Sequence, residues 1–297
     1  MMKTLVFGSC NLDFIYKVAN IVSPGETMGI SAVAQSPGGK GLNQAVALKR
    51  AGMDVAFAGC IGADGAMLKA LLSENGVDVS RVKTVEDRTG QAHIQVTETG
   101  ENAILLYRGA NYQITRKQID ETLADYAAGD LLLLQNEISE LDYLIDAAFR
   151  KGMKIVLNPS PISEEMKKID YGKLWLIFVN EVEVAGLTGG GTPEDLINDF
   201  RRRFPALSVV VTLGAAGSLY FDGKTLLRQP ALPANPVDTT CAGDTFEGYF
   251  TAALCGGCNE KTALLRGAAA ASIVISRIGA AGMIPTKAEV DELLETL

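Results

Sequence analysis

The segment VDTTCAGDTF at residues 237–246 places an acid, Asp244, directly after Gly243 at the expected start of a helix. The next residues, EGYFTAAL, are largely apolar and indicate that helix. The first turn of a helix presents unpaired N–H groups and a partial positive charge, so this segment could bind an anion such as a phosphate group. Asp244 therefore has two interpretations: a cap of the helix, or a functional carboxylate beside a bound phosphate.

Other polar and glycine residues come at the ends of expected strands and at the loops that follow them. The side chains of interest are Asn11, Asp13, Lys40, Asn43, Glu137, Asn158, Asn180 and Glu183, together with the segment TLGAAG at residues 212–217. A surface turn, a helix cap or a solvated helix face explains each of them taken alone. Their shared position at the strand ends of one sheet favours a common ligand site.

Short apolar segments alternate with helical segments along most of the chain. The expected strands are residues 3–9, 54–62, 130–135, 154–160, 176–180 and 208–214, and the expected helices are residues 41–52, 65–76, 140–152, 192–204, 244–257 and 262–276. Continuous apolar strands separated by helices predict a mostly parallel sheet with helices on both faces. Ligands of such sheets bind beyond the carboxyl ends of the strands.

Residues 12–36 and 91–107 interrupt this alternation. The second region reads as a hairpin with its turn at TGEN. Extended segments without crossover helices predict a small antiparallel sheet attached to the α/β body, as a lid or a subunit contact. The expected division is a body of residues 1–11, 37–90 and 108–297 and a lid of residues 12–36 and 91–107.

The charge balance excludes some classes of partner. The 297 residues carry a formal net charge of −8, and the sequence pI is about 4.9. Proteins that bind nucleic acids or membrane surfaces generally present a basic face, so neither partner is expected. No apolar run approaches the roughly 20 residues that span a bilayer, and the N-terminal apolar stretch is too short for a signal peptide. We therefore expect a cytoplasmic protein whose anionic ligands are held by backbone amides, a few cations or a metal.

Cysteine and histidine usage limits the chemistry further. Five scattered cysteines, at positions 10, 60, 241, 255 and 258, favour free thiols. The pair in CGGC has redox or half-zinc spacing, but its glycines also suit a helix end. The single histidine, His93, lies in an alternating, strand-like run that predicts a solvated or cross-strand position. If this chain is an enzyme, its base is expected to be a carboxylate. Neither a Walker loop nor a GxGxxG fingerprint is present.

Seven motifs give the sequence a family resemblance. They are GSCNLD, PGET, GGKGLNQA, NPSP, NEVE, TLGAAG and DTTCAGDTFEG, and they occur in the order found in the ribokinase-like (PfkB) family of carbohydrate kinases. The sequence resembles that family from about residue 5 to residue 285, and most resembles the members that phosphorylate ribose. The resemblance implies a three-layer α/β/α body with a mostly parallel sheet and a small antiparallel β lid.

The resemblance also implies an activity, in which the γ-phosphate of ATP is transferred to the primary hydroxyl of a pentose-type sugar, D-ribose giving ribose 5-phosphate. Asp244 would be the base, and the amides around Ala242 and Gly243, within residues 241–244, would form an anion hole. Side chains and backbone that would bind the sugar are Asn11, Asp13, Gly39, Lys40, Asn43, Glu137 and Asp244. Positions that would bind ATP and order Mg²⁺ are Asn180, Glu183, Thr212, Gly214, Gly217 and Gly243.

Two further features follow from the resemblance. A monovalent cation, usually K⁺, would bind near Asp238, Thr240, Val274, Arg277 and Gly279, although Met283 stands where the family pattern usually has serine, and a thioether is a poor ligand for a hard cation. The lid would cover the sugar and pair with a second lid in a homodimer.

The alternatives left open are a nucleoside kinase with Phe14 and Tyr16 around the base, a phosphosugar kinase using Arg88 and Arg108, a non-catalytic sugar sensor and, remotely, a CxxC redox module.

Overall fold

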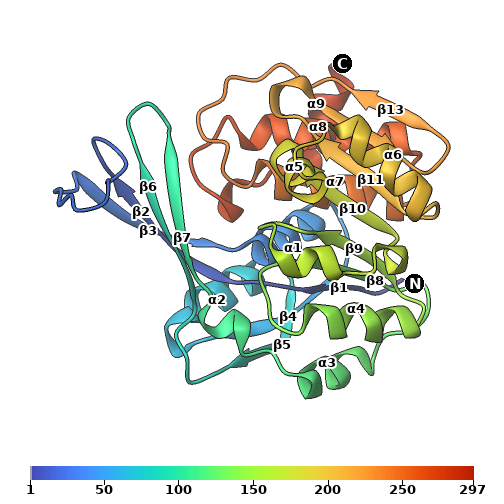
Figure 1. The fold of residues 1–297 in the computed structure, drawn as a ribbon, viewed down its shortest axis with the longest axis horizontal. Coiled ribbons are helices and arrows are strands. Elements are labelled where there is room, and N and C mark those ends of the chain that lie inside the picture. The colour runs from blue at the N-terminus through green and yellow to red at the C-terminus, as the bar shows by residue number, and fades with distance from the viewer. Residues whose placement is uncertain (1) are drawn as a thin grey trace.

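The computed structural model describes residues 2–297, and within that range the strands form one large and one small sheet (Figure 1). The large sheet has the strand order β13-β12-β11-β10-β9-β8-β1-β4-β5. Its strands are β1 (Thr4–Phe7), β4 (Val55–Ile61), β5 (Asp78–Thr84), β8 (Leu131–Gln135), β9 (Lys154–Asn158), β10 (Leu176–Asn180), β11 (Ser208–Thr212), β12 (Ser218–Phe221) and β13 (Leu226–Gln229). Pairing is parallel from β5 to β11 and antiparallel from β11 to β13. The mostly parallel sheet expected from the sequence is confirmed.

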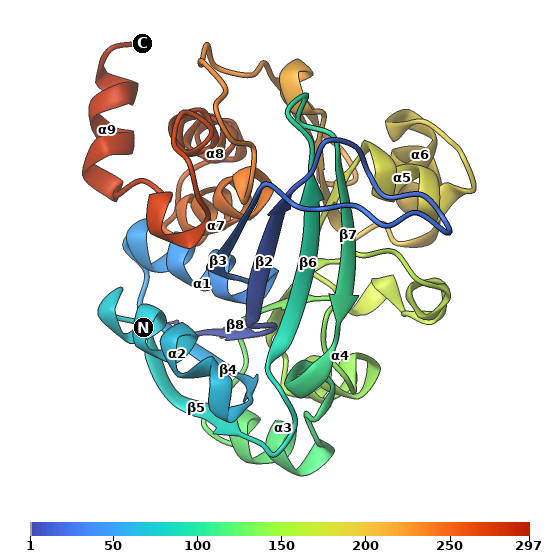
Figure 2. The ribbon, with the colours of Figure 1, turned by 90° about the vertical axis from the view of Figure 1, so that its left-hand side faces the viewer.

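Helices cover both faces of this sheet. They are α1 (Lys40–Arg50), α2 (Ala66–Glu74), α3 (Arg116–Leu123), α4 (Leu141–Arg150), α5 (Glu181–Thr188), α6 (Pro193–Arg203), α7 (Ala242–Cys255), α8 (Glu260–Val274) and α9 (Lys287–Glu295). The helices α1, α2, α7, α8 and α9 lie over one face and α3 to α6 over the other (Figure 2). Successive strand residues point to opposite faces, so Leu132 and Leu133 of β8 enter different cores. This explains why the strands are apolar at nearly every position.

The packing of α1 against α7 positions much of the site. Gly248 of α7 lies directly against α1, where a Cβ atom would come within 2.4 Å of Ala47 Cβ. The absence of a side chain at Gly248 lets the two helices approach closely. Their N-terminal turns therefore face one another at the carboxyl edge of the sheet, where ligand sites of this architecture form.

The small sheet projects from the body (Figure 1) and has the order β3-β2-β6-β7. Its strands are β2 (Asn11–Lys17), β3 (Ala32–Gly38), β6 (Gly90–Val96) and β7 (Asn102–Tyr107). The pairings β2–β3 and β6–β7 are antiparallel, as the sequence predicts, but the central β2–β6 pairing is parallel. Strands β2 and β6 are separated by a long stretch of body rather than by a hairpin, so no turn imposes an antiparallel direction on them.

Other expectations about single residues are met in the structure. The five cysteines are free thiols, and the CGGC segment ends α7 in a turn in which Gly257 has a φ of 89°. His93 lies across from β2, stacked on Phe14 at 5.2 Å between ring centroids and hydrogen-bonded through Nδ1 to the Tyr16 hydroxyl at 2.9 Å. Among residues 2–297, no helix combines the length and apolarity that a membrane crossing demands.

Candidate active site

The start of α7 carries the local geometry that the sequence suggests. Cys241, which precedes the helix, has a φ of 55°, in the left-handed region that non-glycine residues rarely adopt. In the described chain, the N–H groups of Gly243 and Asp244 donate to no other residue, whereas Ala242 N, also expected in the anion hole, donates to Thr239 O at 3.2 Å. Outside its own helical turn, a Cβ atom built on Gly243 would meet no atom of residues 2–297 within 4 Å. The helix end is therefore open and supplies free donors together with the positive end of its dipole.

Asp244 is buried beside this helix end, with 7% of its surface exposed. Asn43 Nδ2 donates to its Oδ2 at 2.9 Å, and Gln44 Nε2 donates to its Oδ1 at 2.8 Å. Burial raises the pKa of Asp244, while the nearby Lys40 charge and the two amide hydrogen bonds lower it, and the net direction is upward. Neither donor comes from the backbone of α7, so Asp244 is not a simple helix cap: its carboxylate is held by α1.

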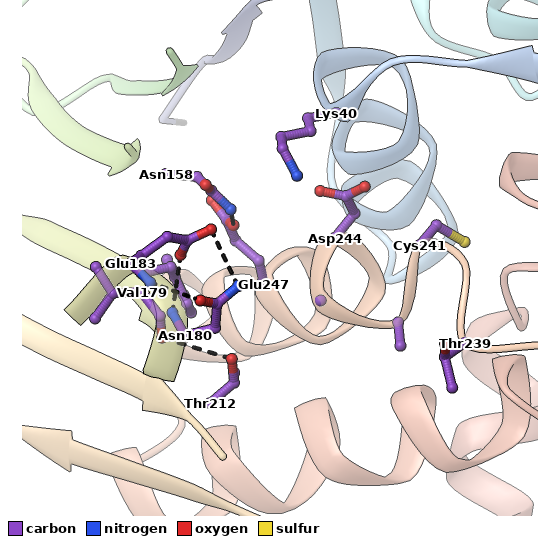
Figure 3. Close-up of a pocket in the computed structure, with 13 residues that line it drawn as sticks. Lys40, Asn158, Val179, Asn180, Glu183, Thr212, Thr239, Cys241, Asp244 and Glu247 are labelled. Atoms are coloured by element: carbon purple, nitrogen blue, oxygen red, sulfur yellow. Dashed lines mark hydrogen bonds between the residues drawn. The ribbon is translucent and has the colours of Figure 1, made fainter. Parts of the chain in front are cut away.

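A cavity of about 240 Å³ opens at this point, between the ends of β10 and β11 and the starts of α1 and α7 (Figure 3). Its wall is made of Lys40, Asn158, Phe178, Val179, Asn180, Glu183, Thr212, Thr239, Cys241, Ala242, Gly243, Asp244 and Glu247. Figure 3 shows Lys40 and Asp244 on one side of this space and Asn158, Asn180 and Glu183 on the other. Many of the strand-end residues identified in the sequence therefore surround one space.

Asn180 and Glu183 form a capping box at the start of α5. Glu183 N donates to Asn180 Oδ1 at 2.9 Å, and Asn180 N donates to Glu183 Oε2 at 2.8 Å. The NxxE spacing thus has a structural role, because these reciprocal bonds satisfy the first turn of the helix. It also fixes the buried Glu183 carboxylate in the wall of the cavity.

Lys40 opens α1, and Glu137, which follows β8, lies beside it. Glu137 Oε2 accepts hydrogen bonds from the Ser9 hydroxyl and from Lys40 N, the latter at 3.3 Å. Burial raises the pKa of Glu137 even though Lys40 opposes the shift. The pKa of Lys40 is also raised, because the surrounding carboxylates Asp244, Glu137, Glu183 and Glu247 outweigh its own burial. Lys40 is therefore the positive centre among several acids.

Asp13 joins this group from the small sheet. Burial, together with repulsion from Glu137 and Asp244, raises the pKa of Asp13 to about 7. Its Oδ1 atom is buried and has no partner in the described chain. Gly38 lies so close to the Asp13 carboxylate that any side chain at 38 would overlap it. Asp13 is thus held in place while it keeps hydrogen-bonding capacity for another molecule.

Asn11 and a neighbour that the sequence did not indicate line a second space. Asn111 Nδ2 donates to Asn11 Oδ1 at 2.8 Å, and Cys10 N donates to Asn111 Oδ1 at 3.0 Å. Both asparagines line a cavity of about 200 Å³ that also includes Glu137 and Arg108. No motif marks Asn111, because it lies in a short 3₁₀ helix after β7, residues Gly109–Tyr112, and reaches Asn11 only through the fold.

The glycines proposed for the site do not all contribute to a cavity. Gly39 has a φ of 95° and allows the turn from β3 into α1. Thr212 lines the first cavity, whereas Gly214 and Gly217 lie in the following loop, outside that wall. At Gly217 a Cβ atom would come within 2.1 Å of Gln229 O, so this glycine is required by the packing of its own turn.

The residues expected around a monovalent cation are brought together in part. Asp238 Oδ1 accepts from Thr240 N at 2.9 Å, and Asp238 Oδ2 accepts from Gly279 N at 3.0 Å. Val274 is fully buried. The Arg277 guanidinium points to Met283 O and Glu289. Val274 and Arg277 could therefore offer only carbonyl oxygens to such an ion, and Val274 O already accepts from Arg277 N at 3.0 Å.

The amino-acid sequence is similar to known proteins along almost its whole length. Residues 1–287 match the model of a family described as pfkB family carbohydrate kinase. A ribokinase of Haemophilus influenzae is 36% identical over 314 residues, with 99% of each chain covered.

Solved structures extend the similarity to three dimensions. Ribokinase from Cryptococcus neoformans var. grubii serotype A, in complex with ADP, matches with a TM-score of 0.88 at 33% identity, covering 99% of this chain and 100% of that one. Arabidopsis thaliana ribokinase complexed with ribose and ATP matches with a TM-score of 0.86 at 28% identity, covering 99% of both chains. The similarity therefore spans the body and the small sheet together.

Proposed function

The chain belongs to the pfkB family of carbohydrate kinases, and from this premise we propose that it transfers the γ-phosphoryl group of ATP to the primary hydroxyl of D-ribose, giving ribose 5-phosphate. The observation that carries the proposal is the buried Asp244 carboxylate beside the open N-terminus of α7. The ribokinases with bound ribose, ATP or ADP among the similar structures support the choice of substrates.

The mechanism follows from the position of Asp244. Its carboxylate accepts the proton of the sugar hydroxyl while that oxygen attacks the γ-phosphorus, and ADP leaves with the electron pair of the broken P–O bond. Phosphoryl transfer has a loose transition state, so alignment and charge neutralisation contribute most of the rate. The free N–H groups at Gly243 and Asp244, with the helix dipole, neutralise the phosphoryl oxygens.

ATP and Mg²⁺ fit the oxygen-rich side of the first cavity. Glu183, held by the capping box with Asn180, presents a carboxylate there, and Mg²⁺ prefers oxygen ligands and retained water. When bound, Mg²⁺ would neutralise phosphate charge. We assign the nucleotide to the region from Thr212 through Gly214 and Gly217, with its phosphates extending to Gly243.

We assign the sugar to the space bounded by Asn11, Asp13, Gly39, Lys40, Asn43, Glu137 and Asp244. Two of these groups have a buried oxygen with unused hydrogen-bonding capacity, Asp13 Oδ1 and Asn43 Oδ1. A site with unsatisfied polar atoms binds the ligand that satisfies them and rejects the analogue that does not. The β2–β3 and β6–β7 sheet would then act as a lid that excludes water from the reaction.

Substitution of Asp13 tests this placement. Asp13→Ala is expected to lower kcat/KM for ribose by about 10²-fold, since loss of hydrogen bonds to a charged group costs about 1.5–3 kcal/mol, and to leave KM for ATP within about twofold. Steady-state kinetics with each substrate varied in turn measures both. The matched control is Glu98→Ala, which removes an exposed acid from the same sheet region. An effect confined to KM for ATP would contradict the assignment of Asp13 to the sugar.

A monovalent cation at the Asp238 loop is part of the same proposal. The Asp238 carboxylate keeps acceptor capacity beyond its two backbone bonds, and its position beside the start of α7 links the loop to the anion hole. Replacing K⁺ with tetramethylammonium at constant ionic strength is expected to lower kcat several-fold, because the larger ion does not fit between Asp238 and neighbouring carbonyl groups. In Asp238→Ala the two salts should give equal rates. Equal rates in the wild type would mean that the loop binds no such ion. Met283, which lies beside Gly279, would be the reason, because its thioether is a poor ligand for a hard cation.

The identity of the acceptor is tested by a substrate panel. Ribose, deoxyribose, fructose, adenosine and phosphosugars are each assayed with Mg-ATP through coupled ADP detection. The proposal expects the highest kcat/KM with ribose. A preference for adenosine or for a phosphosugar would replace ribose by that substrate while the transfer chemistry stayed the same.

We also propose that the lid pairs with a second copy of the chain. Its apolar residues Val33, Ile104, Leu105 and Leu106 are between 46% and 69% exposed, which is costly for a free surface.

A cytoplasmic location without nucleic-acid or membrane partners is proposed from the net charge of −8.

A further inference from the structure

Glu247 is a buried acid that the motifs do not explain. It lies on α7 three residues after Asp244, so both side chains lie on the same face of the helix. Only 1% of its surface is exposed, and it contributes to the wall of the 240 Å³ cavity. An acid is almost never buried to this degree unless something compensates its charge.

The hydrogen bonds of Glu247 satisfy one carboxylate oxygen only. Oε2 accepts from Asn158 Nδ2 at 3.0 Å and from Gln44 Nε2 at 3.2 Å. Oε1 is buried and has no partner in the described chain. Gln44 cannot turn to serve it, because Gln44 also donates to Asp244 and its Oε1 accepts from Gln135 Nε2 at 2.5 Å. The fixed network therefore leaves one oxygen available for another group.

No cation of the described chain pairs with Glu247. Within residues 2–297, no ion pair within 4.0 Å involves Glu247 or Glu183. The cavity wall carries the carboxylates of Asp244, Glu183 and Glu247 against the single ammonium of Lys40. A polyphosphate entering such a space would be repelled unless a cation entered with it.

Mg²⁺ matches these requirements. It is a hard cation that is commonly bound by one or two carboxylates plus substrate phosphates, with water completing the coordination. We propose that Glu247 Oε1 is a direct ligand of the divalent cation and that Glu247 and Glu183 together form the protein side of its site. The inference rests on the proposed function for the identity of the bound phosphate, but the cation site itself is testable without nucleotide.

The test measures binding of Mn²⁺, a paramagnetic substitute for Mg²⁺, to the nucleotide-free full-length enzyme. Free aqueous Mn²⁺ is followed by its electron paramagnetic resonance signal during a titration to millimolar concentration. The wild type is expected to bind one Mn²⁺ per chain, and Glu247→Gln is expected to bind it at least tenfold more weakly, because the substitution keeps the shape but removes the charge. Glu247→Asp, which retains a carboxylate, should bind more tightly than Glu247→Gln.

The matched control is Glu181→Gln, which removes an exposed acid from the first turn of the α5 helix that holds Glu183. Its affinity should stay within twofold of the wild type. Unchanged binding in Glu247→Gln, or no binding by the wild type, would overturn the inference. Far-UV circular dichroism verifies folding, and Glu247→Asn takes the place of Glu247→Gln if that variant does not fold.

The two proposals fail in distinguishable ways. Phosphorylation of ribose together with unchanged Mn²⁺ binding in Glu247→Gln leaves the kinase function intact and refutes the role of Glu247. Loss of Mn²⁺ binding in that variant, in a protein that phosphorylates no sugar, supports the cation site and refutes the function.

Discussion

Asp244→Asn is expected to lower kcat by roughly 10²–10⁴-fold, the usual contribution of a general base, while both substrates still bind within a few-fold of the wild-type affinity. The structure indicates that the variant will fold. An asparagine at 244 can accept the hydrogen bond from Gln44 through its oxygen. Asn43 Oδ1 has no hydrogen-bond partner among the described residues, so the Asn43 amide can rotate and accept from the new NH₂ group. Only the basicity of the side chain is lost.

Kinetics and calorimetry measure the two halves of this expectation. Steady-state assays give kcat, and isothermal titration gives the affinity for ribose and the affinity for ATP, each measured without the other substrate. Asp54→Asn is the matched control, because Asp54 forms an exposed pair with Lys49 at 2.9 Å, outside both cavities. A near-wild-type kcat in Asp244→Asn would refute the assignment of the base.

Gly243→Ala is the second substitution with a large expected effect. Outside its own helical turn, the added methyl group would meet no described atom within 4 Å, and alanine is the better helix former, so stability to thermal unfolding should be unchanged or higher. The methyl group would instead occupy space proposed for the γ-phosphoryl group. We expect kcat/KM for ATP to fall by about 10²-fold, comparable with the loss of one anion-hole donor.

Gly248→Ala, on the same helix, is the informative counterpart. Its methyl group would come within 2.4 Å of Ala47 Cβ and force α1 away from α7, so this variant should lose thermal stability. Gly243→Ala should therefore lose activity but keep its thermal stability, whereas Gly248→Ala should lose thermal stability. Wild-type kinetics in Gly243→Ala would contradict the placement of the phosphoryl group at this helix end.

The large sheet was predictable because its strands are buried on both faces. Runs such as DLLLLQ at residues 130–135 have no polar alternation, and in a chain with intervening helices that pattern is specific to a parallel sheet. The small sheet was less predictable. Its strands were recognisable, but the parallel β2–β6 pairing depends on how two segments meet after the body has folded, and no local pattern encodes that direction.

The site was predictable where a residue follows a strand or opens a helix, as Asp244, Asn158 and Glu183 do. The residues that hold those groups in place were not. Gln44 lies within the motif GGKGLNQA, which by itself indicates no role for it, yet it donates to both Asp244 and Glu247. The signal that could have identified Glu247 is its spacing of three residues from Asp244 on one helix face.

Asn180 shows that one residue can satisfy two interpretations. The sequence leaves a helix cap and a phosphate- or metal-ordering role open, and the structure shows the cap. The same capping box fixes Glu183 in the cavity wall. The hydrogen bonds that cap the helix therefore also hold the carboxylate where the proposed chemistry needs it. Sequence spacing alone does not separate them, since both require Asn and Glu three residues apart.

The central claim is that Asp244 and the open end of α7 bring a sugar hydroxyl and the γ-phosphate of ATP together. Phosphorus NMR of wild type and Asp244→Asn, each incubated with Mg-ATP and ribose, tests it most directly. We expect the wild type to convert ATP into ADP and a phosphomonoester whose phosphorus couples to the two C5 protons of ribose, and the variant to form almost none. Release of inorganic phosphate in place of that ester, or equal ester formation by the two proteins, would contradict the claim.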